Sequence, residues 1–181
     1  MRKSLFILTP LFATLLAASS LTQAASNGQI TISGSVVDVT CDVSVPASLN
    51  LGNFAKSAFT TVATPVNGST QSFNIELSNC GSPSANGKAS VIMSGNTLPG
   101  NPTIFNAKDG TAGVMISTDL APTTYLTSDT KIQVATAPAT SPSPAAFNNK
   151  TLKLWAGLAA TKTNPETGVV NAPVTFSFFY N

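Results

Sequence analysis

Hydrophobic and polar residues alternate along much of the chain in short runs, which is typical of β-strands that bury one face. Turn-forming residues separate these runs, and no segment keeps the period of an amphipathic helix. The pattern therefore predicts an all-β domain. Loops are predicted where glycine, asparagine and proline gather, at 95–102 and 137–146. The predicted strands are residues 37–45, 49–54, 59–66, 71–80, 89–93, 113–118, 131–135, 152–158 and 174–180.

The alternation changes phase near residue 36. Ile30, Ile32, Gly34 and Val36 share one side of an extended chain, whereas the odd positions are apolar throughout residues 37–45. A slip of one residue turns every inward side chain outward. Two explanations fit this slip. One is a β-bulge in a single continuous strand; the other is a pair of strands that pack in different sheets, even in different molecules.

The predicted last strand has one strongly apolar face. Val174, Phe176, Phe178 and Tyr180 share that face, and no strand is predicted after them. A core strand in this position predicts a sandwich with one uncovered flank and one row of unpaired backbone groups. An extended, alternating segment such as residues 30–36 fits such an edge by β-strand addition.

The first 24 residues predict a secretory signal. Arg2 and Lys3 precede an apolar stretch at 5–18, and small residues end at Ala24, the preferred cleavage point, with Ala25 as the alternative. An uncleaved membrane anchor is disfavoured because the apolar stretch is short and interrupted. The predicted organisation is a signal peptide at 1–24, an arm at 25–36 and one domain at 37–181.

Charge excludes several classes of partner. Removal of the signal leaves seven basic and seven acidic residues, and only 9% of the whole chain is charged. A neutral surface of this kind does not attract phosphate backbones or anionic lipids. Nucleic acid and membrane surfaces are therefore not expected partners.

Cys41 and Cys80 are the two cysteines of the chain. An even count behind a secretory signal predicts a disulfide bond between them. Closing a loop of about 40 residues contributes about 4 kcal/mol in the chain-entropy account. A metal site is disfavoured because the sequence has no histidine and no third cysteine.

The residues that catalysis requires are scarce. Without histidine, neither a Ser-His-Asp nor a Cys-His arrangement can form. Asp38 and Asp42 are the carboxylates closest in sequence, and strand geometry separates them by about 13 Å, farther than a glycosidase pair requires. The sequence predicts a protein that is not an enzyme, has no cofactor and acts on no small-molecule substrate.

Several features together resemble the structural pilins of chaperone/usher fimbriae, the type 1-like major subunits. They are an alternating arm with an internal glycine, Gly34; a cysteine soon after it that bonds to a second, Cys41 to Cys80; Gly168, fourteen residues from the C-terminus; and a penultimate tyrosine, Tyr180. The resemblance covers the whole mature length.

The resemblance implies an incomplete immunoglobulin-like Greek-key sandwich that lacks its C-terminal strand and is completed by a donor strand from another subunit. Its implied partners are identical pilin subunits in a head-to-tail homopolymer, a periplasmic chaperone and an outer-membrane usher, and its implied location is a cell-surface fimbrium reached through the periplasm. The alternative is a minor tip or adhesin subunit that binds a host glycan, which a single domain with one tryptophan disfavours. The implied donor residues are Ile30, Ile32, Gly34 and Val36, and the implied acceptor or chaperone-binding residues are Val174, Phe176, Phe178 and Tyr180.

Overall fold

A computed structural model of the chain describes residues 39–181. The predicted signal peptide and arm lie outside this part. The described residues form strands and two short 3-10 helices, which confirms the all-β prediction, and among them no helix is long and apolar enough to cross a bilayer. The strands are β1 Asp42–Ser44, β2 Gln71–Ser78, β3 Lys88–Gly95, β4 Thr97–Leu98, β5 Asn101–Phe105, β6 Ala112–Ser117, β7 Thr130–Thr136, β8 Lys150–Ala160 and β9 Val174–Tyr180; the 3-10 helices are η1 Lys56–Ala58 and η2 Pro144–Ala146.

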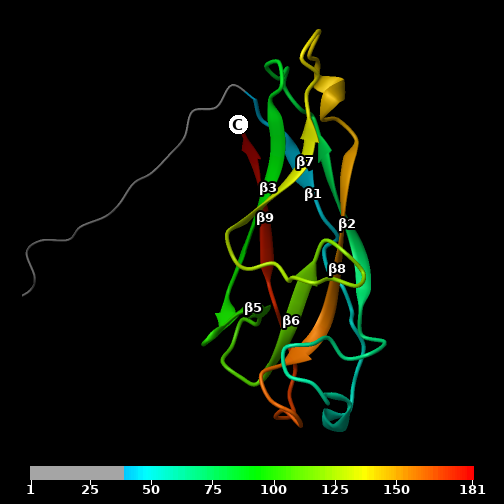
Figure 1. Cartoon of the computed structure of the whole chain (residues 1–181), viewed down its shortest axis with the longest axis vertical. Helices are drawn as coiled ribbons and strands as arrows, with labels where there is room; N and C mark the ends of the chain where they lie inside the picture. Colours follow the sequence, from blue (N-terminus) through cyan, green and yellow to red (C-terminus); the bar gives the residue numbers. More distant parts are fainter. Residues whose placement is uncertain (1–38) are drawn as a thin grey trace, which may run out of the picture. The chain divides into compact units, whose positions relative to one another are not determined.

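The strands form two antiparallel sheets. One has the order β1-β2-β8-β6-β5-β4 and the other the order β7-β3-β9. Strands β1, β2, β8 and β6 have the A-B-E-D order of an immunoglobulin sandwich, and β3 and β9 take the positions of C and F. Figure 1 shows β9, in red, running along β3. In the part of the chain described, no strand takes the position of G on the far side of β9.

The inward faces of the two sheets form the main core. Leu77 of β2 and Leu154 of β8 are fully buried against Val91 and Met93 of β3. Alternation along each strand produces this layer, because every second side chain points to the same face of a sheet. Phe147, which follows η2, is also fully buried and belongs to the same core.

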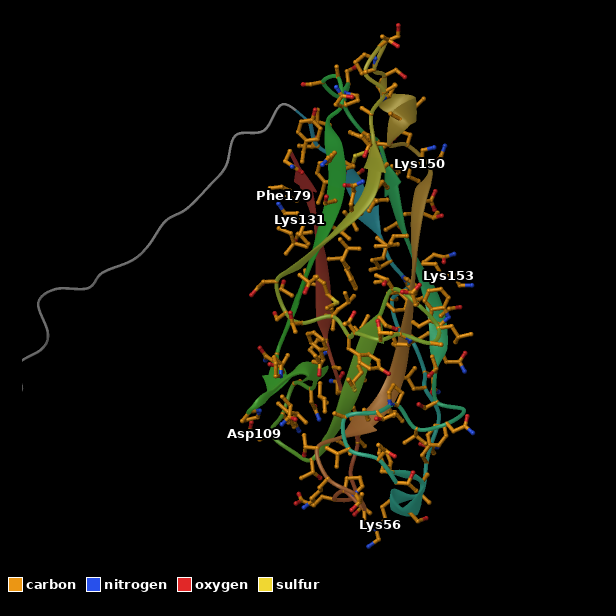
Figure 2. The ribbon with its side chains drawn as sticks, viewed as in Figure 1. Lys56, Asp109, Lys131, Lys150, Lys153 and Phe179 are labelled. Carbon is orange, nitrogen blue, oxygen red and sulfur yellow. A yellow bond between two sulfur atoms is a disulfide. The ribbon has the colours of Figure 1, made fainter. Side chains whose placement is uncertain are left out.

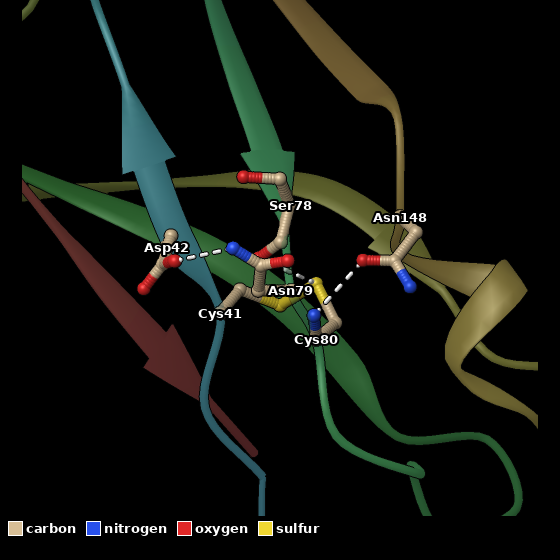
Figure 3. Close-up of a disulfide and its surroundings, with 6 residues drawn as sticks. All are labelled: Cys41, Asp42, Ser78, Asn79, Cys80 and Asn148. Atoms are coloured by element: carbon tan, nitrogen blue, oxygen red, sulfur yellow. Dashed lines mark hydrogen bonds between the residues drawn. A yellow bond between two sulfur atoms is a disulfide. The ribbon is translucent and has the colours of Figure 1, made fainter.

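The disulfide between Cys41 and Cys80 is present, as predicted. It joins the start of β1 to the residue after Asn79 at the end of β2 (Figure 3). The Asn79 side-chain amide donates to Asp42 Oδ2 at 2.8 Å, and the Cys80 backbone N–H donates to Asn148 Oδ1 at 2.9 Å. The disulfide and the Asn79–Asp42 contact fix β1 against β2 near one end of the sandwich, and the Cys80–Asn148 contact ties the end of β2 to the segment before β8.

Three predicted strands need correction. Within 37–45 only Asp42–Ser44 forms a strand among the described residues, although Val39 is buried and Thr40 exposed as the alternation predicts. Residues 49–54 form no strand, and Gly52 in their middle has φ of +89°. Residues 59–66 form turns, and their apolar ends are buried in a small separate cluster instead of a sheet.

One predicted loop is also wrong. Residues 95–102 contain β4 and the start of β5, which pair as an irregular hairpin. Gly100 has φ of +71° in the turn between them, a conformation that glycine adopts easily. The glycine and proline residues here do form a turn, as the pattern indicates. The strands on either side of it are too short to show the alternation that would predict them.

Candidate functional site

Two strand edges lie open on the same flank of the sandwich. β9 pairs with β3 along its whole length, from Val174 opposite Gly95 to Tyr180 opposite Ala89. Its other edge pairs with no strand in residues 39–181. β1 pairs with β2 over three residues and ends at Ser44, so the rest of β2 has no strand on that side within the same residues.

A groove of about 950 Å³ lies on this flank. Its floor is the inward face of the larger sheet, which presents only apolar side chains here. These floor residues are Phe73 of β2, Ala112, Val114 and Ile116 of β6, and Ala156 and Leu158 of β8.

The groove has one wall on each side of this floor. Residues 45–54 form one wall, where Leu51 and Phe54 are partly buried and Val45 remains 42% exposed. Residues 165–176 form the other, and Val174 and Phe176 contribute its strand portion. The groove therefore has an apolar floor and walls in which apolar side chains alternate with polar ones such as Asn50, Asn53 and Asn171.

The wall before β9 is anchored to neighbouring loops. The Glu166 N–H donates to Thr111 Oγ1 at 2.9 Å, and the Ala107 N–H donates to the Asn171 carbonyl at 2.7 Å. Pro173 stands immediately before β9, where a missing N–H weakens strand pairing. These contacts hold residues 165–173 beside the groove. The segment forms no strand and leaves the groove open.

The four predicted acceptor residues divide into two pairs. Val174 and Phe176 line the groove, and the Phe176 ring lies 6.0 Å from that of Phe73 across the two sheets. Phe178 and Tyr180 lie beyond it, packed against the main core, and the Tyr180 ring makes an edge contact with Phe147 at 6.1 Å. The structure thus brings two of the four to the groove.

Phe179 lies on the opposite face of β9. Lys131 Nζ is 3.4 Å from the centre of its ring, on the outer surface of the smaller sheet (Figure 2). A cation over an aromatic face is a favourable surface contact. The other face of β9, which carries Val174, Phe176 and Phe178, therefore points toward the interior of the sandwich.

The groove carries little charge and no catalytic arrangement. Lys56 and Glu166 are its charged lining residues, and Glu166 forms an exposed ion pair with Lys162 at 3.1 Å. No cluster of three histidine, cysteine, aspartate or glutamate residues that could hold a metal occurs in residues 39–181. Such a groove can bind an extended apolar segment, with backbone groups of β9 available for hydrogen bonds.

The predicted donor residues Ile30, Ile32, Gly34 and Val36 lie outside the described residues. The floor of the groove was not predicted from sequence as a site. Val114, Ile116 and Leu158 have the alternation of ordinary core residues, and nothing in that pattern separates a covered core from an open one.

The fold and groove define an immunoglobulin-like sandwich with an open strand position. Residues 30–181 match the family described as Fimbrial protein, and the chain belongs to this family. It is a subunit of a cell-surface fimbrium and a structural protein, which confirms the resemblance to chaperone/usher pilins.

Two further comparisons accompany this match. A type-1 fimbrial protein subunit of Serratia marcescens is 30% identical over 106 residues, which are 57% of this chain and 56% of that protein, so the match spans a little over half of each. The crystal structure of the P pilus rod subunit PapA is similar with a TM-score of 0.49 and 18% identity, covering 84% of this chain and 100% of that chain.

Proposed function

We propose that this chain is the repeating subunit of an adhesive fimbria and polymerises by donor-strand exchange. The segment Ile30–Val36 of one copy lies in the groove beside β9 of the next. In this proposal residues 1–24 are removed on secretion. A periplasmic chaperone occupies the groove until an outer-membrane usher transfers the subunit to the fibre, and residues 25–36 then act as the donor arm.

The observation that carries the proposal is the open apolar groove beside an unpaired strand edge. The length of the free edge of β9 suits the arm, because Ile30–Val36 and Val174–Tyr180 have equal numbers of residues and therefore equal extended lengths. Gly34 has no side chain, so the donor backbone can come close to the floor at that position.

The energetics favour a durable link. Burying Ile30, Ile32 and Val36 contributes about 5–9 kcal/mol at about 1.5–3 kcal/mol each. Each backbone hydrogen bond to β9 adds about 0.5–1.5 kcal/mol, and ordering of the arm opposes both terms. Because the donor completes a core, its departure requires the core to open, which makes dissociation slow.

The geometry also favours a fibre over a closed oligomer. Each subunit would use two different surfaces, an arm and a groove, so that every contact leaves one arm and one groove unused at the ends. A heterologous contact of this kind extends into a filament unless its rotation closes a ring.

The test is a variant in which residues 27–36 are moved behind Asn181 through a flexible linker. We expect this variant to be a stable monomer without chaperone, whereas the mature chain without a donor folds poorly or aggregates. Size-exclusion chromatography and thermal unfolding measure both properties.

A matched control carries the same extension with Ile30→Asp and Ile32→Asp, which leaves linker and length unchanged. We expect it to behave like the chain without a donor, because buried unpaired carboxylates oppose insertion. A mature chain that is already a stable monomer, with nothing gained from the extension, would contradict the proposal.

A further inference from the structure

We propose that Asn67–Gly68 is a self-modifying site at which the subunit slowly loses ammonia and acquires a negative charge. Asn67 and Gly68 are the exposed central residues of a β-turn, closed by a hydrogen bond of 3.0 Å from the Ser69 N–H to the Val66 carbonyl. Gly68 has φ of +81°, the value that the third residue of a type II turn requires.

The reaction needs no partner other than water. The deprotonated backbone nitrogen of Gly68 attacks Cγ of Asn67, a C–N bond forms, and ammonia leaves, which produces a succinimide ring. Water then adds to either ring carbonyl and opens the ring to aspartate or isoaspartate. The net change is one water consumed and one ammonia released, with no oxidation or reduction. Glycine favours the attack because no Cβ shields its nitrogen.

The surroundings leave this nitrogen accessible. The Gly68 N–H makes no hydrogen bond to any described residue. A Cβ placed on Gly68 would meet no atom within 4 Å, so the space around the turn is open.

A second asparagine–glycine pair provides an internal comparison. In Asn86–Gly87 the Gly87 N–H donates to the Ser84 carbonyl at 3.1 Å, and the Gly87 carbonyl accepts from the Ala137 N–H at 2.8 Å. Gly87 is also buried beneath the ring of Tyr180. Its nitrogen is therefore occupied and its backbone cannot turn toward the asparagine side chain without local opening.

The modification would alter the pairing of β8. Strand pairing between β2 and β8 ends at Gln71 opposite Ala156. Beyond it the turn continues the pairing, because the Val66 N–H donates to the Leu158 carbonyl at 2.7 Å and the Leu158 N–H donates to Ser69 Oγ at 3.0 Å. Isoaspartate lengthens the main chain inside this turn by one carbon, and Leu158 lies on the groove floor. Ageing of the turn is thus expected to loosen one part of that floor.

The experiment follows both sites in fimbriae purified from cells that express the chain. Samples are incubated at neutral and mildly alkaline pH and digested. Peptide mass spectrometry separates the two sites from the third pair, Asn27–Gly28, and isoaspartyl methyltransferase labelling detects isoaspartate. In folded fimbriae Asn67 is expected to react at least about tenfold faster than Asn86, since even modest local stability reduces the reactive fraction by that factor. The rate should rise with pH, because the nucleophile is a deprotonated amide.

Two variants and one denatured sample complete the test. Asn67→Gln abolishes the modification in the turn, whereas Asn86→Gln leaves it unchanged. After unfolding, both sites are expected to react at similar rates. Equal rates at Asn67 and Asn86 in folded fimbriae would overturn the inference, and so would an Asn67 that reacts only after unfolding.

Discussion

The side chains of β9 alternate between two faces of the strand, and this alternation allows a direct test of where the donor strand binds. Phe176 lines the groove, whereas Phe179, on the same strand, contacts Lys131 on the outer surface. If the arm fills the groove, at least one of its residues Ile30, Ile32 and Val36 must contact Phe176. None of them should contact Phe179.

The expected magnitudes follow from these positions. With a donor in place, truncating Phe176 to alanine costs about 3–5 kcal/mol, the range for a buried phenylalanine. The same truncation at Phe179 removes mainly its contact with Lys131, which contributes about 0.5–1 kcal/mol. Residues in contact show coupling energies of about 0.5–3 kcal/mol in double-mutant cycles, and distant residues are additive within about 0.3–0.5 kcal/mol.

The assay uses the variant that carries its own donor after Asn181. Three cycles pair Phe176→Ala with alanine at each of the arm residues Ile30, Ile32 and Val36, and three control cycles use Phe179→Ala. Equilibrium unfolding in guanidinium chloride, followed by circular dichroism, provides the free energies. At least one Phe176 cycle should show coupling. If none couples more strongly than its Phe179 counterpart, the arm does not occupy this groove.

Three further predictions concern the fold itself and are measured on the variant that carries its own donor after Asn181. Replacing the disulfide, Cys41→Ser with Cys80→Ser, should lower the free energy of unfolding by about 4 kcal/mol in denaturant titrations, because the cysteines are 39 positions apart in the sequence. A loss below about 1 kcal/mol would contradict the loop-entropy account. Gly87→Ala should cost about 1–3 kcal/mol, since the new Cβ overlaps the penultimate tyrosine, whereas Gly168→Ala, with no atom within 4 Å, should leave Tm unchanged; equal Tm shifts would refute this. Burial raises the pKa of Tyr125 above 10.0, so the folded state favours the neutral phenol and stability present below pH 10 is lost as the pH rises through the folded pKa. Tyr125→Phe should reduce that alkaline loss in pH-dependent unfolding, and an unchanged profile would disprove it.

Strong alternation predicted two of the longer strands well. β2 and β9 appear almost where the pattern placed them, because each has one face of large apolar residues that only a sheet could bury. The same rule failed at residues 59–66, where Phe59 and Val66 are buried in a cluster beside Ala160 without any strand. Burial of two apolar ends can be achieved by turns as well as by a strand, so the pattern alone does not decide between them.

The sequence predicted that the last strand has an open edge, but not which residues form the groove beside it. The sequence indicated an uncovered edge at the last strand, and the free side of β9 has that position. It did not indicate that Phe178 and Tyr180 would lie beyond the groove, partly buried against the main core, nor that residues 45–54 would form the opposite wall. The position of that wall depends on where β1 stops pairing with β2, because residues 45–54 directly follow Ser44, and a local periodicity does not encode this end point.

The change of phase at residue 36 acquires a physical meaning from the described part of the chain. Val39 is buried and Cys41 and Val43 are partly buried in the subunit's own core, whereas Thr40 and Asp42 are exposed. A straight extension of this strand toward the N-terminus would place the odd positions inward and the apolar even positions, 30 to 36, outward. In a single sheet that arrangement exposes three aliphatic side chains. The arrangement becomes favourable if another subunit buries those side chains. The even positions 30 to 36 then face the core of that subunit, while the odd positions from Val39 onward face the core of their own.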